Sequence, residues 1–145
     1  MRNLLFFLML SFVFCAELQA EDTKHLFSIQ EALASKNFDG RLRKEIKFYF
    51  GGKSDQRINK NLGNFTAQRR TNSFRHTSDR EACEWAFLAA LLSLQKRVVA
   101  KGGNAVINIR SFYKRNELNS KTKFECRVGI LRTGVALKGT VVSLD

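Results

Sequence analysis

Few residues of this chain have the type and spacing needed for catalysis or metal binding. Its two histidines, His25 and His76, do not have the spacing from a cysteine that zinc sites use. The segment Gly52-Lys53-Ser54 looks like the end of a phosphate-binding P-loop, but the first glycine of that motif would fall at Lys47. Without this glycine the loop cannot wrap a phosphate. Because no nucleophile and base can be paired, we expect no enzyme, no catalytic residue, no metal and no cofactor.

The N-terminal segment has the organisation of an export signal. A basic residue precedes an apolar run from Leu4 to Cys15, and small residues stand near the end of the segment, the last of them Ala20. We therefore expect a signal peptide over 1–20 and a single exported domain over 21–145, in the periplasm or secreted. The apolar run is shorter than the roughly 18 residues of a spanning helix, and no later run reaches that length. No transmembrane segment is expected after cleavage.

Cleavage of this signal changes the cysteine count. Of the three cysteines, Cys15 belongs to the signal, which leaves Cys83 and Cys126. An even number in an oxidising compartment favours pairing, so we expect a Cys83–Cys126 disulfide, with two buried thiols or a metal pair as alternatives. The disulfide would close a loop of about 44 residues and contribute on the order of 4 kcal/mol. A lipoprotein signal at Cys15 is less favoured, because bulky Phe14 precedes it where such signals place a small residue.

Positive charge dominates the rest of the chain. It has 25 Lys and Arg against 13 Asp and Glu, a net charge of +12, and loss of 1–20 removes one residue of each sign. Eleven basic residues but only three acidic ones lie between 41 and 80. Outside the cytoplasm this excess favours phosphorylated lipid head groups, an acidic glycan or an acidic protein over nucleic acid, although bulk solubility and adhesion are the alternative. The candidate anion-binding residues are Arg69, Arg70, Arg75 and Lys47.

Secondary-structure signals are strongest around one long helix. Ser78 and Glu81 have capping-box spacing, and the segment from there to Lys101 is rich in Ala and Leu and ends at Gly102-Gly103. An apolar stripe at helical spacing predicts that this helix is deeply buried. The residues of the stripe are Trp85, Leu88, Ala89, Leu92 and Val99, broadened by Phe87, Leu91, Leu94 and Val98.

The segments before this helix are shorter. Ser28 and Glu31 repeat the capping-box spacing and predict a short helix that ends at 37–40. Alternation over 46–50 predicts a half-buried strand that runs into a Gly-Gly turn, and a second short strand is expected over 64–71.

Three strand-like segments follow the long helix. They cover 105–112, 123–131 and 135–142, joined by the polar stretch 114–122 and by a turn at Thr133-Gly134. Alternation places Ala105, Ile107 and Ile109 on one face, and it places Cys126 on the face that should meet the helix. The predicted fold class is α+β, with one long helix packed on a mostly antiparallel sheet, a short N-terminal helix and a core over about 78–143.

The long helix is followed by three motifs, Lys101-Gly-Gly-Asn-Ala-Val-Ile107, Glu125-Cys-Arg-Val-Gly129 and Gly134-Val-Ala-Leu-Lys-Gly-Thr-Val-Val142. Through them the segment 81–142 resembles the YbjQ-like domains, which include small cytoplasmic proteins described as heavy-metal-binding and the Rcs outer-membrane stress-sensor lipoprotein. Three further motifs are Phe48-Tyr-Phe-Gly51, Ala82-Cys-Glu-Trp-Ala-Phe87 and Gly103-Asn-Ala-Val-Ile-Asn-Ile-Arg110. Through these the whole mature chain is similar to uncharacterised exported bacterial proteins, some of them described as excinuclease-like.

This resemblance implies a fold more than an activity. The stress sensor has a helix-to-strand disulfide that Cys83 and Cys126 could reproduce, but its lipobox and second cysteine pair have no counterpart here. YbjQ-like relatives form rings, which leaves a homo-oligomer open. We expect an exported, non-catalytic binding or interaction module with a basic surface. The alternative is a nucleic-acid-binding or nuclease accessory protein, as the excinuclease-like description would suggest.

Overall fold

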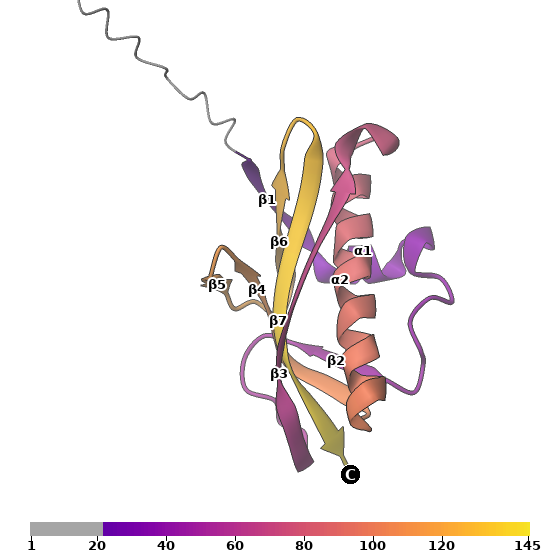
Figure 1. The fold of residues 1–145 in the computed structure, drawn as a ribbon, viewed down its shortest axis with the longest axis vertical. Coiled ribbons are helices and arrows are strands. Elements are labelled where there is room, and N and C mark those ends of the chain that lie inside the picture. The colour runs from indigo at the N-terminus through magenta and orange to yellow at the C-terminus, as the bar shows by residue number, and fades with distance from the viewer. Residues whose placement is uncertain (1–21) are drawn as a thin grey trace, which may run out of the picture.

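The computed structural model describes residues 22–145, so the predicted signal peptide over 1–20 lies outside the described residues (Figure 1). Seven strands, two α-helices and two 3₁₀ helices make up the described chain. In order they are β1 (Thr23–Ser28), α1 (Ile29–Ala34), η1 (Lys36–Phe38), β2 (Lys47–Phe50), β3 (Ile58–Asn72), η2 (Ser73–Arg75), α2 (Asp79–Lys101), β4 (Ala105–Tyr113), β5 (Asn116–Leu118), β6 (Lys123–Val128) and β7 (Arg132–Leu144).

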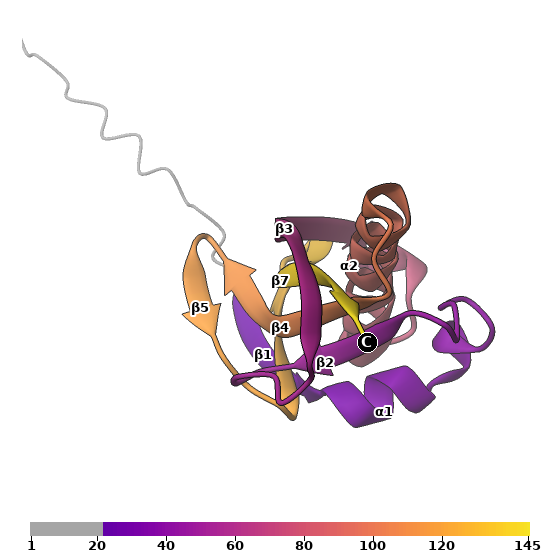
Figure 2. The same ribbon diagram turned by 90° about the horizontal axis from the view of Figure 1, so that it is seen from below.

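Strand β7 organises the sheet. It pairs antiparallel with β3 along nearly its whole length, while β6 and then β4 pair with successive parts of its other edge. Strand β1 adds to β6, and β4 carries both β5 and a parallel β2. The sheet curls, and α2 lies along one face of it (Figures 1 and 2). The predicted α+β fold, with one long helix on a mostly antiparallel sheet, is confirmed.

Helix α2 begins and ends where its capping signals predict. The Ser78 hydroxyl oxygen accepts a hydrogen bond from the backbone N–H of Glu81, and Gly102 closes the helix with a left-handed φ of 72°. The predicted stripe is partly wrong, because Val99 is 50% exposed and Trp85 and Leu92 only border the core. Leu88 and the four residues expected to broaden the stripe are buried as predicted. The buried residues of α2 are Ala82, Cys83, Ala86, Phe87, Leu88, Ala90, Leu91, Leu94, Gln95 and Val98.

The predicted disulfide is present in the core. Cys83, in the second turn of α2, is bonded to Cys126 of β6 across a sequence separation of 43, and both residues are fully buried. Phe87 stacks on Phe124 beside this bond, with ring centroids 4.2 Å apart. The disulfide therefore ties the helix to the sheet within the apolar layer that they share.

Three predictions about the strands are corrected. The short strand expected over 64–71 is β3, with 15 residues, and the polar stretch 114–122 contains β5. The turn expected at Thr133-Gly134 is also wrong, because both residues pair within β7 and the chain turns at 129–131 instead. The local pattern placed the turn at Gly134 because glycine is common in turns. Pairing with β3 and β6 instead extends β7 back to Arg132.

The alternation predicted along β4 breaks at Asn108. This residue has a positive φ of 52°, and the pairing of β4 with β7 shifts between Ile107 and Arg110. Ile109 consequently joins the main core, while Ile107 packs with Ala105 in a small second cluster. A bulge of this kind reverses the facing of every residue that follows it.

Candidate anion-binding site

The structure separates the two adjacent candidates, Arg69 and Arg70. Successive side chains of a strand point to opposite faces. Arg69 lies opposite Val135, on the face covered by α2, and its guanidinium donates to the Ser93 hydroxyl at 2.8 Å. Arg70 lies opposite Gly134, on the outer face of the sheet. The two arginines therefore cannot hold one ligand together.

The other two candidates, Arg75 and Lys47, lie far from each other. Arg75 is exposed in η2, just after β3. Lys47 of β2 lies opposite Ala105, which in turn lies opposite Val142 near the far end of β7. Gly134 and Val142 are separated by roughly 27 Å along an extended strand, so Lys47 does not belong with Arg70.

The structure instead brings Arg70 together with two arginines from other strands. Strand register places Arg127 of β6 and Arg70 of β3 on either side of Gly134. Arg70, Arg127 and Arg132 line a hollow of about 130 Å³ on the outer face, with Asp22 and Tyr113. Gly134 leaves the space between the strands open, because a Cβ there would lie 3.3 Å from Cγ of Arg70.

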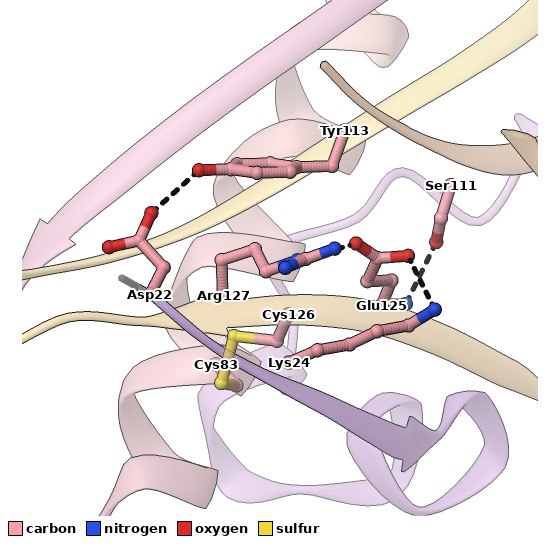
Figure 3. Close-up of polar contacts among 8 residues, drawn as sticks. All are labelled: Asp22, Lys24, Cys83, Ser111, Tyr113, Glu125, Cys126 and Arg127. Atoms are coloured by element: carbon pink, nitrogen blue, oxygen red, sulfur yellow. Dashed lines mark hydrogen bonds and ion pairs between the residues drawn. A yellow bond between two sulfur atoms is a disulfide. The ribbon is translucent and has the colours of Figure 1, made fainter. Parts of the chain in front are cut away.

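Arg127 forms an ion pair with the buried carboxylate of Glu125. Its Nε donates to Oε1 of Glu125 at 2.7 Å, and Lys24 Nζ lies 3.6 Å from the other oxygen of this carboxylate (Figure 3). Glu125 is 3% exposed, and its backbone N–H donates to the Ser111 hydroxyl at 2.8 Å. Buried charges need partners of this kind. Of this cluster only Arg127 lines the hollow, and its bond to Glu125 fixes its position there.

Tyr113 and Asp22 form the polar wall. The Tyr113 hydroxyl donates to Oδ2 of Asp22 at 2.6 Å, and the Arg127 guanidinium lies 4.9 Å from the centroid of the tyrosine ring (Figure 3). The hydrogen bond to Asp22, followed by burial and the charge of Asp22, raises the pKa of Tyr113 above its usual value. The phenol therefore stays protonated at neutral pH and keeps one Asp22 oxygen occupied.

Arg70 and Arg132 are left to face solvent. Within residues 22–145 no ion pair joins either of them to a carboxylate, whereas five other arginines have one. Both also line a larger hollow of about 450 Å³, with Thr71, Asn72, Phe74 and Leu131. Two planar guanidinium groups at one hollow can donate several hydrogen bonds to a phosphate, sulfate or carboxylate. The five paired arginines are Arg43, Arg57, Arg80, Arg110 and Arg127.

Sequence reasoning found Arg70 but missed Arg132 and Arg127. It concentrated on the basic segment 41–80, and both missed residues lie in the C-terminal strands. Arg132 reaches this surface because it pairs opposite Asn72, at the end of β3. That pairing joins residues far apart in the chain, and no local pattern reveals it.

Each of the two histidines contacts an aromatic ring, and His76 also contacts a hydroxyl group. His25 stacks on Phe27 with the rings 2° from parallel, and His76 Nε2 lies 2.8 Å from the Thr71 hydroxyl, beside Trp85. Across residues 22–145, no three His, Cys, Asp or Glu side chains gather where they could hold a metal ion.

No helix within residues 22–145 has both the length and the apolar character needed to cross a membrane. Comparison with protein-family models and with curated proteins finds no match to this chain.

Proposed function

We propose that this protein is an exported, non-catalytic binding module that holds an anionic partner at Arg70 and Arg132. The observation that carries the proposal is that both guanidinium groups line the same two hollows, of about 130 Å³ and about 450 Å³, and that neither has a carboxylate partner among the described residues. Of the residues that line the smaller hollow, Asp22 alone is acidic, and Tyr113 occupies one of the Asp22 oxygens. An anion entering the hollow would therefore meet a positive surface.

Net charge supports the same proposal at longer range. The chain carries +12, so the field around the molecule attracts anions before any contact forms. At physiological ionic strength this field is screened over about 8 Å, which means that only groups close to the hollow select the ligand. Arg75 contributes to the positive rim in this proposal, while Arg69 and Lys47 do not.

Export belongs to the proposal as well. A Cys83–Cys126 disulfide is the state expected of paired cysteines outside the cytoplasm, in agreement with the predicted signal peptide and a periplasmic or secreted location. We also propose that the domain is YbjQ-like, which a long helix on a curled sheet and a helix-to-strand disulfide support. We place the partner among the anionic components of the envelope or acidic proteins.

The test is crosslinking in intact cells that export the full chain, followed by identification of what is captured. An Arg70→Glu/Arg132→Glu variant reverses both charges, and Arg57→Glu/Lys60→Glu matches it in charge at the opposite end of β3. We expect the first variant to lose a specific anionic partner that the control retains. Capture of the same set by both variants would mean that the positive charge acts only in bulk.

Nucleic acid is tested in the same preparation. Binding through phosphate contacts would give retention on DNA or RNA that falls steeply with salt. Retention near physiological salt, lost in the Arg70→Glu/Arg132→Glu variant, would replace the proposed partner with a nucleic acid.

A further inference from the structure

Three of the most exposed large apolar side chains lie together at one end of the molecule. Phe74 is 71% exposed, Ile130 is 74% exposed and Leu131 is 64% exposed. Phe74 belongs to η2, and the other two form the turn between β6 and β7, beside the end of β3 at the top of Figure 1. The backbone N–H of Ser73 donates to the carbonyl of Leu131 at 3.0 Å, which joins the two segments. We call Phe74, Ile130 and Leu131 the apolar tip.

The backbone of the tip is held by hydrogen bonds. The N–H of Gly129 donates to the carbonyl of Arg132 at 2.9 Å and closes the turn. The hydroxyl of Ser73 donates to the carbonyl of Gly129 at 3.1 Å and lies 3.0 Å from the hydroxyl of buried Thr133. The tip side chains are therefore presented to solvent by a hydrogen-bonded turn and the adjoining η2, where polar residues would ordinarily stand.

The tip and the arginines of the candidate site share the same surface. Phe74 and Leu131 line the hollow of about 450 Å³ together with Arg70 and Arg132. A neighbouring hollow of about 440 Å³ is lined by Ile130, Leu131, Arg132, Gly129 and Asp22. A ligand at this end would meet guanidinium groups and apolar side chains side by side. That combination matches an amphiphile with an anionic head group.

We propose that this end of the protein docks on the surface of an anionic phospholipid bilayer. Arg70 and Arg132 bind phosphate groups, and the apolar tip enters the boundary between head groups and acyl chains. This inference rests on the proposed function and names its partner. Arg75, exposed next to Phe74 in η2, adds a third positive charge close to the tip.

A bilayer fits the shape of the tip better than an acidic protein does. A stable protein interface buries about 800 Å² on each partner, with its apolar centre ringed by polar residues. Here the apolar side chains are three, from a turn and the adjacent η2, and each is more than 60% exposed with Arg70 and Arg132 lining the same hollow. A fluid interface accepts projecting side chains without a matching pocket.

The test measures sedimentation of protein produced from the full-length chain with vesicles of phosphatidylcholine alone or with an equal part of phosphatidylglycerol. We expect binding to the mixed vesicles. Replacing Phe74, Ile130 or Leu131 by Ser should weaken it about tenfold for each side chain, because each change removes apolar area from the acyl boundary. Replacing Arg70 or Arg132 by Gln should weaken it about fivefold for each charge.

Matched controls lie at the other end of the molecule. Ile58 and Val99 are 45% and 50% exposed, so Ile58→Ser and Val99→Ser remove exposed apolar surface away from the tip. Lys53→Gln and Lys60→Gln remove exposed charges there. An Ile130→Trp change in a Trp85→Phe background places the single tryptophan at the tip and reports depth directly, because brominated acyl chains should quench a tryptophan that enters the bilayer.

Each outcome decides the proposal. Weaker binding by the tip and arginine variants, normal binding by the controls and quenching of Ile130→Trp would support it. Binding that tip variants retain in full would overturn it, since adsorption would then be by charge alone. A parallel assay with heparin separates the two proposals. Binding to heparin that needs Arg70 and Arg132, with none to vesicles, would overturn only the bilayer inference. No binding to either, together with crosslinking that captures the same set in the Arg70→Glu/Arg132→Glu variant and in its control, would overturn both.

Discussion

Reduction of the Cys83–Cys126 disulfide should lower the free energy of unfolding by about 4 kcal/mol. The bond closes a loop with a sequence separation of 43, and loop closure of that length removes about 13 cal/mol/K of entropy from the unfolded chain, or about 4 kcal/mol at 25 °C. With a urea m-value of about 1.5 kcal/mol/M, the unfolding midpoint should fall by roughly 2.5 M. This loss would be a large part of the stability of a single domain.

The assay is urea unfolding of the oxidised and the reduced chain. Trp85 is the only tryptophan, and it lies half-buried on α2 with the Arg41 guanidinium 4.5 Å from its ring, so its fluorescence should report unfolding. Both cysteines are fully buried, which means that the protein has to be reduced in denaturant and then refolded. The m-value should rise on reduction, because the unfolded chain becomes less compact.

A Cys83→Ala/Cys126→Ala variant is the control. It has no crosslink, so its midpoint should be the same with and without reductant. A difference of less than about 1 kcal/mol between the oxidised and the reduced wild-type chain would refute the reasoning, because the loop-closure term would then be absent.

Two further predictions concern the outer face and the sheet. In a Tyr49→Phe variant Tyr113 is the only tyrosine, and its alkaline absorbance change should occur at higher pH in the folded chain than in urea, because the hydrogen bond to Asp22 raises its pKa. The stability that this pKa shift contributes is complete below a pH of about 10 and is lost as the pH rises through the pKa of Tyr113 in the folded chain. Equal titration midpoints in the folded and the unfolded chain would contradict the prediction. A Gly139→Ala variant should lose about 1 to 3 kcal/mol in urea unfolding, because its Cβ would lie 2.6 Å from Cγ1 of Val106. Gly139→Val should lose more, and unchanged midpoints would mean that β4 and β7 can separate to admit the side chain.

Much of the fold could be predicted because its signals are local. Ser78 and Gly102 mark the ends of α2 by chemistry that acts within one turn of the helix. Strand alternation places Cys126 on the face that meets the helix, and Cys83 stands in the first turns of that helix. The expected disulfide and the expected packing therefore agreed with each other, and both are present in the fold.

The turn between β6 and β7 could not be predicted in the same way. Ile130 and Leu131 are apolar and continue the pattern of the preceding strand, so sequence reasoning extended that strand through them. The structure exposes both, because the chain reverses at Gly129 and the pairing of β7 with β3 begins at Arg132. Apolar residues exposed in a turn contradict hydrophobic patterning, and this is why they point to a function.

Composition and local spacing by themselves determined the net charge, the long helix, the identity of the cysteine pair and the mostly antiparallel sheet. Only the tertiary structure decided which basic residues act together. Arg69 and Arg70 are neighbours in the chain, yet the pleat of β3 sends them to opposite faces. Arg70 and Arg132 are far apart in the chain, yet pairing of β3 with β7 brings both to one hollow. Register across strands is set by the packing of the whole sheet, so the binding surface emerges only when the chain has folded.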